Sequence, residues 1–242
     1  MRKNGERQMT NGTMIVKRDG SKEHLNIDKI HVVVEHACEG LAGVSSSQIE
    51  MNANLQFYDN MSTIEIQEIL IRSANDLISL EAPNYQYAAA RLLSYTVNKQ
   101  VFGEYNAFSF KEMIDKNIER GMYDSAILDS YTEEEIATLG RYIHHKRDEN
   151  FTYAGMRQVV DKYLVQDRST GELFETPQFM YMMIAATLFA QYPAETRMHY
   201  VRRYYDATSL FKVNIPTPVM AGVRTPVRQF ASCVLVDSDD TL

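Results

Sequence analysis

Apolar residues recur every three or four positions through most of the chain, which is the spacing of one face of an α-helix. After Asp28 the apolar residues that share a face are Ile30, Val33, Val34 and Ala37. The pattern predicts a helix over residues 29–41, with Asp28 as its N-cap and Gly40 at its end.

Three further helix starts are marked by capping boxes, in which a Ser or Thr is followed three residues later by a Glu. The boxes are Ser62 with Glu65, Ser109 with Glu112, and Thr132 with Glu135. Thr176 before Pro177 marks another start, because proline fits the first helical turn. Besides the helices that begin at the boxes, the spacing predicts helices at residues 47–57, 85–102, 153–165, 178–191 and 193–210.

Residues 13–27 have the pattern of a β-hairpin. Asp19-Gly20 is a tight-turn pair, because glycine accepts a positive φ, and apolar residues flank it on both sides. Another turn is expected at residues 167–172, between short strand-like runs.

The last segment, residues 211–242, differs from the helical part before it. Apolar runs at residues 213–215 and 233–236 flank a stretch rich in Pro, Gly and Thr, a composition that opposes helix. We expect a strand, a loop and a second strand there. A chain that ends as a sheet begins is expected to be incomplete.

The composition is that of a globular protein, with 45% hydrophobic and 24% charged residues among 242. No apolar run approaches the about 18 residues of a membrane span, and the polar start of the chain has no signal peptide. Two distant cysteines give neither a disulfide framework nor metal-ligand spacing, which favours the reducing cytoplasm. The net charge of −7 argues against nonspecific nucleic-acid binding.

Polar and charged residues collect around the predicted hairpin, namely Lys17, Arg18, Lys22, Glu23, Asn26, Asp28 and Lys29. Two interpretations stay open: a solvated hairpin tip, or an anion site where cations from a strand and a helix start converge. The sequence has no glycine-rich phosphate-binding motif.

Three other clusters are interpreted as structural. His144-His145 follows a helix, where cations favour the helix dipole. The methionines of residues 180–183 are expected in the core. Three tyrosines at helical spacing are also expected in the core, with their hydroxyls directed to water. These are Tyr200, Tyr204 and Tyr205.

The two cysteines are interpreted differently. Cys38 lies on the apolar side of its helix and is predicted to be an inert, buried thiol. Cys233 lies at a predicted strand end, where a thiol can be both accessible and ionisable. The residues near it in sequence that supply hydroxyls and cations are Thr217, Arg224, Arg228 and Ser232. These residues by themselves name no reaction.

Longer motifs carry a resemblance. At the end of the chain stands Ile215-Pro-Thr-Pro-Val-Met-Ala-Gly-Val-Arg-Thr-Pro-Val-Arg-Gln-Phe-Ala-Ser-Cys-Val-Leu. Near its start stand Val16-Lys-Arg-Asp-Gly-Ser, Leu25-Asn-Ile-Asp-Lys-Ile-His, Gln56-Phe-Tyr-Asp and Tyr85-Gln-Tyr-Ala-Ala-Ala-Arg-Leu. Between them stand Asp129-Ser-Tyr-Thr-Glu-Glu-Glu, Lys162-Tyr-Leu-Val-Gln and Tyr192-Pro-Ala-Glu-Thr-Arg. In this order they resemble the large (α) subunit of class Ia ribonucleotide reductase, of the bacterial and phage type.

The resemblance implies a mainly α fold in four parts. A flexible N-terminus covers residues 1–11, and an ATP cone, a hairpin with about four helices, covers residues 12–103. A helical domain follows at residues 104–212. Residues 213–242 then supply the first strand and loop of a ten-stranded α/β barrel.

The resemblance also implies functional positions. In the cone, ATP, with Mg, is held by Lys17, Glu23, Asn26, Lys29, Thr63 and Lys99. In the barrel, Thr217 and Ser232 bind the substrate, and Cys233 is one of the two thiols that reduce the ribose 2′ position. The specificity effector site begins with Asp240, Thr241 and Leu242. Gln67 and His36 stand where relatives inhibited by dATP have His and Trp, so ATP binding is expected and dATP inhibition is not.

The implied function is reduction of ribonucleoside diphosphates by a radical that starts at a di-iron tyrosyl centre in the small subunit. Thioredoxin or glutaredoxin restores the thiols. The radical cysteine and the partner of Cys233 lie beyond the matched region, so we expect the chain to need the remaining part of the large subunit, as a truncated or a split subunit. No metal site, nucleic acid or membrane is expected. The alternatives are a regulatory nucleotide-binding module without catalysis and a purely structural assembly piece.

Overall fold

The computed structural model describes residues 12–103 and 107–236. They form two compact units. The first contains residues 12–96 and 149–157, and the second contains the described residues of 97–148 together with 158–236. The expected flexible segment 1–11 lies outside the described residues, and the expected domain boundaries after residues 103 and 212 stay predictions.

The first unit begins with the predicted hairpin. Strand β1 (Met14–Val16) pairs antiparallel with β2 (Lys22–His24), and Gly20 takes a φ of 81° in the turn between them. A third strand, β3 (Met61–Ser62), pairs parallel with β1 and was not foreseen. The sheet order is therefore β2-β1-β3.

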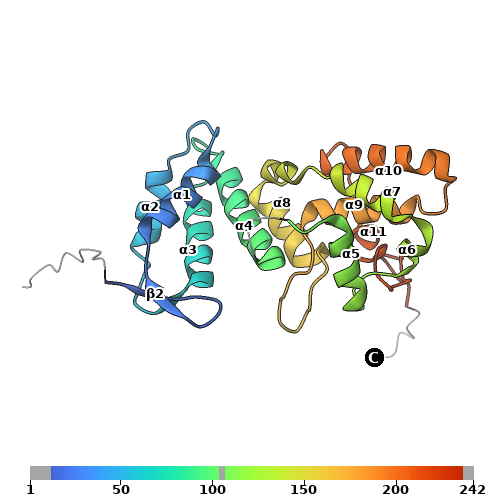
Figure 1. Cartoon of the computed structure of the whole chain (residues 1–242). Helices are drawn as coiled ribbons and strands as arrows, with labels where there is room; N and C mark the ends of the chain where they lie inside the picture. Colours follow the sequence, from blue (N-terminus) through green and yellow to red (C-terminus); the bar gives the residue numbers. More distant parts are fainter. Residues whose placement is uncertain (1–11, 104–106, 237–242) are drawn as a thin grey trace, which may run out of the picture. The chain divides into compact units, whose positions relative to one another are not determined.

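Four helices follow the hairpin in the first unit (Figure 1). They are α1 (Ile27–Cys38), α2 (Ser46–Asn54), α3 (Thr63–Asn75) and most of α4 (Tyr85–Phe102). The prediction of Asp28 as the N-cap of α1 was wrong. Asn26 caps it instead, because its side chain accepts the backbone N–H of Lys29 at 3.1 Å, while Asp28 lies in the first turn.

The second unit is helical. Its elements are α5 (Phe110–Glu119), α6 (Ala126–Ser130), α7 (Glu133–Arg141), the start of the 3₁₀ helix η1 (His145–Asn150), the π-helical turn η2 (Val159–Tyr163), α9 (Pro177–Leu188), α10 (Ala194–Ser209) and α11 (Thr217–Gly222). The predicted helix 153–165 is therefore α8 (Tyr153–Gln158), whose residues up to Arg157 belong to the first unit, followed by η2. The three capping boxes are confirmed.

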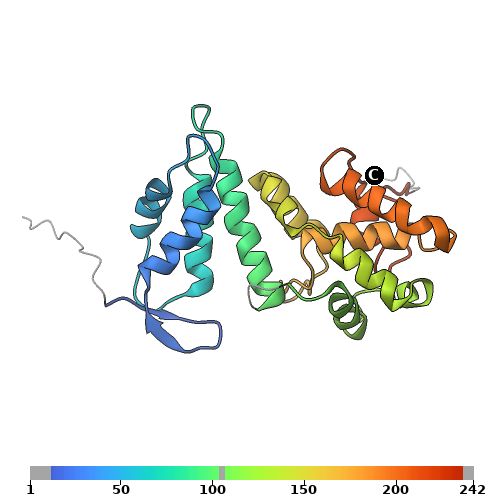
Figure 2. The ribbon, with the colours of Figure 1, turned by 45° about the horizontal axis from the view of Figure 1, so that its top comes forward.

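Helix α9 is the centre of the second unit. Its residues from Pro177 to Ala186 are all buried, which confirms the methionine cluster as core, and α10 lies beside it in both ribbon views (Figures 1 and 2). Tyr205 on α10 is also fully buried. Its hydroxyl donates to Gln178 at 2.6 Å and accepts the N–H of His144 at 2.9 Å, so its predicted contact with water was wrong.

The tail after α10 differs from the prediction. Residues 213–215 and 233–236 form no strand, and α11 lies where the composition was expected to oppose helix. The reason is local: Pro218 falls in the first turn of α11, where a backbone N–H has no helical partner to lose. At residues 167–172 the turn is present, but only the single bridge Gln166–Leu173 flanks it.

Candidate functional site

The hairpin brings the predicted cone residues Lys17, Glu23 and Lys29 together. The Glu23 carboxylate lies 3.4 Å from the Lys17 ammonium and 3.7 Å from that of Lys29. Lys17 follows β1, Glu23 lies in β2 and Lys29 lies in the first turn of α1, so cations from two elements meet at one carboxylate. Because all three side chains are partly or largely exposed and the carboxylate already pairs with both lysines, the solvated-tip and anion-site interpretations both stay open.

The third strand explains how Thr63 comes to the same place. Val16 of β1 pairs with Ser62 of β3, and the next residues along the two chains are Lys17 and Thr63. Because β1 and β3 are parallel, both residues leave the sheet at the same end. Asn26 is occupied as the cap of α1. Lys99 lies in the last turn of α4, within the second unit, and its part in the cone site stays a prediction.

His36 and Gln67, the two positions at which the chain differs from the relatives inhibited by dATP, have different surroundings. His36 is exposed on α1. Gln67 lies on α3, and its side-chain oxygen is buried with no hydrogen-bond partner among the described residues.

In the tail, the predicted substrate residues lie in the second unit. The Thr217 hydroxyl, at the start of α11, lies 3.1 Å from the hydroxyl of Tyr163. Ser232 and Cys233 are exposed neighbours, with the serine oxygen 3.7 Å from the thiol sulfur. By contrast, Cys38 is half-buried, and burial raises its pKa to about 11. Asp240, Thr241 and Leu242 lie outside the described residues.

The two cations that lie near Cys233 in the sequence are both paired with carboxylates. Arg228 forms an ion pair with Asp124, and Arg224 is completely buried against Glu175. Both guanidinium groups are therefore engaged by carboxylates far away in the sequence.

Arg224 is the centre of a buried polar cluster that the sequence did not predict. Its Nε lies 3.1 and 2.9 Å from the two carboxylate oxygens of Glu175, and its Nη2 also contacts that carboxylate. Glu175 accepts a 2.5 Å hydrogen bond from Tyr123 and a 2.7 Å hydrogen bond from the N–H of Val165. Burial and the neighbouring carboxylate raise the pKa of the Tyr123 phenol. Burial opposes the charge of Arg224, yet Glu175 holds its pKa above the ordinary value.

One signal for this cluster is present in the sequence: Glu175 is a single charged residue between Phe174 and the apolar helix α9. An acid in such a run is buried only when it is paired. The sequence could not show which cation supplies the pair, since Arg224 is 49 residues away.

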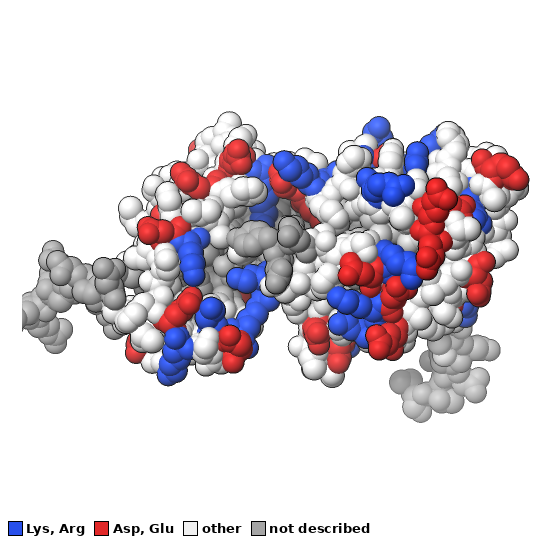
Figure 3. Space-filling model, viewed as in Figure 1, with Lys and Arg blue, Asp and Glu red and all other residues white. Residues whose placement is uncertain are grey.

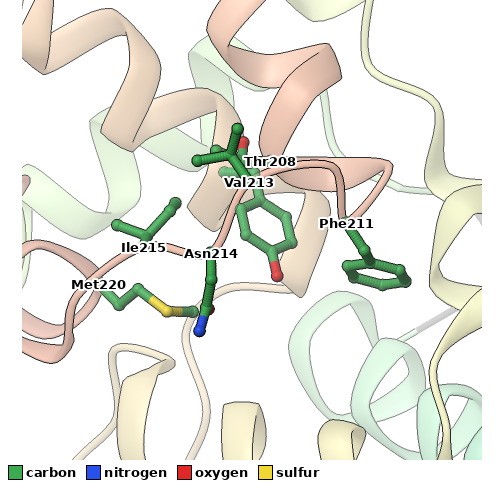
Figure 4. A pocket seen from close by; sticks show the side chains of 7 residues that line it. Thr208, Phe211, Val213, Asn214, Ile215 and Met220 are labelled. Atoms are coloured by element: carbon green, nitrogen blue, oxygen red, sulfur yellow. The ribbon is translucent and has the colours of Figure 1, made fainter.

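A cavity of about 150 Å³ lies beneath the start of the tail (Figure 4). It is lined by Tyr181, Thr208, Phe211, Val213, Asn214, Ile215 and Met220. Burial raises the pKa of the Tyr181 phenol, so this group stays protonated at neutral pH. The cavity therefore has a mixed apolar and hydrogen-bonding lining without a charged side chain.

Basic and acidic side chains are interspersed over the face shown in Figure 3. Among the described residues, no group of three or more His, Cys, Asp or Glu side chains could hold a metal ion. Within residues 12–103 and 107–236, no helix combines the length and apolar character needed to cross a membrane.

Two protein families match parts of the chain and indicate the class of protein that it resembles. Residues 13–100 match the ATP cone domain family, and residues 149–228 match the family described as the all-alpha domain of ribonucleotide reductase. These two stretches of the chain are therefore similar to an ATP cone and to the helical domain of ribonucleotide reductases.

The relatives confirm the resemblance to the large subunit. The chain is 49% identical to ribonucleoside-diphosphate reductase 1 subunit alpha of Escherichia coli (strain K12), over 97% of the chain and 31% of that protein. The same values hold for the subunit alpha of Haemophilus influenzae. The subunit alpha of Enterobacteria phage T4 is 41% identical over 94% of the chain and 30% of its own length. The chain spans about a third of the length of these curated relatives.

Proposed function

We propose that the chain supplies the N-terminal part of a ribonucleoside-diphosphate reductase α subunit and contributes to making deoxyribonucleotides in the cytoplasm. The observation that carries the proposal is the 49% identity to reductase α subunits along 97% of the chain. The remaining part of the large subunit and the small subunit, which generates the radical, are the proposed partners. Residues 213–242 would open the catalytic barrel.

In this proposal the Cys233 thiol is one of two reductants of the ribose. The 2′ hydroxyl leaves as water, and the two thiols give up their hydrogens and become a disulfide, which thioredoxin or glutaredoxin reduces again. The second thiol and the radical cysteine would come from the remaining part of the subunit. The exposed position of Cys233 supports this role, because a reducing thiol must reach both the substrate and the reductant.

Thr217 and Ser232 would hold the diphosphate or ribose of the substrate. Asp240, Thr241 and Leu242 would contribute to the specificity effector site. Thr217 is an exposed residue at the N-terminus of α11, next to Pro218, which is compatible with contact to a ligand from solvent.

The cone would bind ATP, with Mg, as an allosteric effector. The lysines at positions 17 and 29 would neutralise the phosphates, with Glu23, Asn26, Thr63 and Lys99 completing the site. The support from the structure is the convergence of Lys17 and Lys29 on Glu23. A phosphate group would compete with that carboxylate for the same two cations.

The test of the reductase function uses the chain reconstituted with the remaining large-subunit part and the small subunit. Cys233→Ser should abolish formation of deoxycytidine diphosphate, because serine cannot form the disulfide. Cys38→Ser, which changes the half-buried thiol, is the matched control and should keep the wild-type rate. Full activity of the Cys233→Ser complex would refute the catalytic role.

A further inference from the structure

The guanidinium group of Arg224 connects the two elements that carry the Thr217 contact. Its Nη1 donates to the carbonyl of Met220, within α11, at 2.5 Å. Its Nη2 donates to the carbonyl of Tyr163, the last residue of η2, at 2.8 Å. One rigid, planar group therefore fixes the distance between α11 and η2.

The same two elements meet a second time through side chains. The hydroxyl of Tyr163 lies 3.1 Å from that of Thr217, and the amide of Gln158 donates to the Tyr163 hydroxyl at 3.4 Å. Tyr163 thus contacts Arg224 through its carbonyl and Thr217 through its side chain. A shift of Arg224 would move both contacts together.

The energetics of the ion pair favour a positional role. Arg224 and Glu175 are both fully buried, and burying two charges costs about as much free energy as their attraction returns. Such pairs add little net stability, but a pair whose donors and acceptors are all used permits one geometry only. Here the Nε, Nη1 and Nη2 groups each have an acceptor, and both oxygens of Glu175 accept further hydrogen bonds.

We propose that Arg224 and Glu175 are positioning residues that hold Thr217 where the substrate binds. This inference rests on the proposed function, in which Thr217 contacts the diphosphate or ribose. The pair acts through α11 and Tyr163 and does not itself touch the substrate.

The test is steady-state kinetics of cytidine diphosphate reduction by the reconstituted complex. Arg224→Lys keeps the charge but loses the planar set of N–H donors of the guanidinium group. KM should therefore rise about tenfold while kcat stays within about twofold. Tyr163→Phe leaves the ion pair intact and removes the hydroxyl next to Thr217, so KM should rise about fivefold.

The matched control is Arg197→Lys. Arg197 also forms a two-bonded ion pair with a glutamate, Glu135, in the same unit, with distances of 3.1 and 2.6 Å, but it joins α7 to α10 and does not contact the tail. KM should therefore be unchanged in this variant. An equal KM rise in Arg197→Lys and Arg224→Lys, or an unchanged KM in both Arg224→Lys and Tyr163→Phe, would overturn the proposal.

Hydrogen exchange of the chain separates this inference from the proposed function. In Arg224→Lys the amides of α11 should exchange at least about tenfold faster than in Arg197→Lys. If the wild-type complex fails to reduce the substrate, the proposed function is wrong, and the exchange rates alone then decide whether Arg224 holds α11. Equal exchange of α11 in the two variants would reject that role.

Discussion

At the scale of single residues, the imidazole of His31 stands out because carboxylates contact both of its nitrogens. Nδ1 lies 2.8 Å from Glu50 on α2, and Nε2 lies 3.6 Å from Glu35, one turn further along α1. The hydrogen bond to Glu50 and its charge, aided by Glu35 and Asp28, raise the pKa of His31 above its ordinary value of 6.5. The charged imidazole therefore helps to hold α1 against α2.

The first prediction follows from the sign of that shift. A group whose pKa is raised on folding stabilises the fold fully below its unfolded pKa, and the effect is lost as pH rises through its folded pKa. The wild-type chain should melt at a higher temperature than His31→Gln at pH 5.5, and the difference should be smaller at pH 8.5.

Thermal unfolding followed by circular dichroism at both pH values measures this difference. Glu50→Gln removes the main partner of His31 and should likewise reduce the pH-dependent part of the melting temperature. A difference between wild type and His31→Gln that is equal at the two pH values would contradict the assignment.

At the scale of elements, two threonines occupy the same position at helix starts but have opposite surroundings. Thr132, the N-cap of α7, accepts the N–H of Glu135 at 3.2 Å. Thr176, the N-cap of α9, is fully buried, and its hydroxyl has no hydrogen-bond partner within the described part of the chain. The threonine hydroxyl therefore stabilises the start of α7 but not the start of α9.

The same substitution at both positions tests this contrast. Thr132→Val should lower the free energy of unfolding by about 1 kcal/mol, the usual contribution of a cap. Thr176→Val should leave it unchanged or raise it slightly, since a buried hydroxyl without a partner costs free energy. Urea denaturation of the two variants gives the values. Equal losses would mean that the Thr176 hydroxyl is hydrogen-bonded after all.

At the scale of the whole molecule, the two units are expected to have different ligands. The first unit carries Lys17 and Lys29, two of the cations proposed for ATP, and the second unit carries Thr217, Ser232 and Cys233. Nucleotide effectors should therefore bind to the chain without any other subunit.

Isothermal titration of the purified chain with ATP tests the cone. Lys17→Ala should weaken ATP binding by about tenfold or more, because a hydrogen bond to a charged group contributes about 1.5–3 kcal/mol. Lys22→Ala is the matched control from the same hairpin; Lys22 donates to Asn60 at 2.7 Å and should be dispensable. Parallel titration with dATP examines the consequence of Gln67 and His36. The absence of heat with either nucleotide would contradict the cone assignment.

Local features were predictable because their causes lie within a few residues. The capping box of Ser62 and Glu65 is formed by hydrogen bonds between residues three positions apart. Gly20 forms the hairpin turn because glycine accepts a positive φ. The meeting of Lys17 and Lys29 at Glu23 could be anticipated because one short stretch contains all three, while their role in binding ATP stays a prediction. In the same way, α4 spans the predicted residues 85–102.

What the sequence could not show depends on pairs that are distant along the chain. Ile15 pairs with Met61 and Val16 with Ser62, and this pairing brings Thr63 to the hairpin. The two-residue length of β3 gives no periodic signal in the sequence. The cap of α1 is a local exception: the helix starts at Ile27, and the Asn26 side chain accepts the N–H of Lys29.

The sequence by itself determined most of the helices, the turn of the hairpin and the motifs that carry the resemblance to the reductase large subunit. Only the tertiary structure decided the partners of the tail. From the sequence, Arg224 is a charged residue in an expected loop, yet in the structure it lies completely buried against Glu175. The physical reason is that a side chain's helix propensity and cap chemistry act over one turn, whereas a buried charge needs a partner from wherever the fold supplies one.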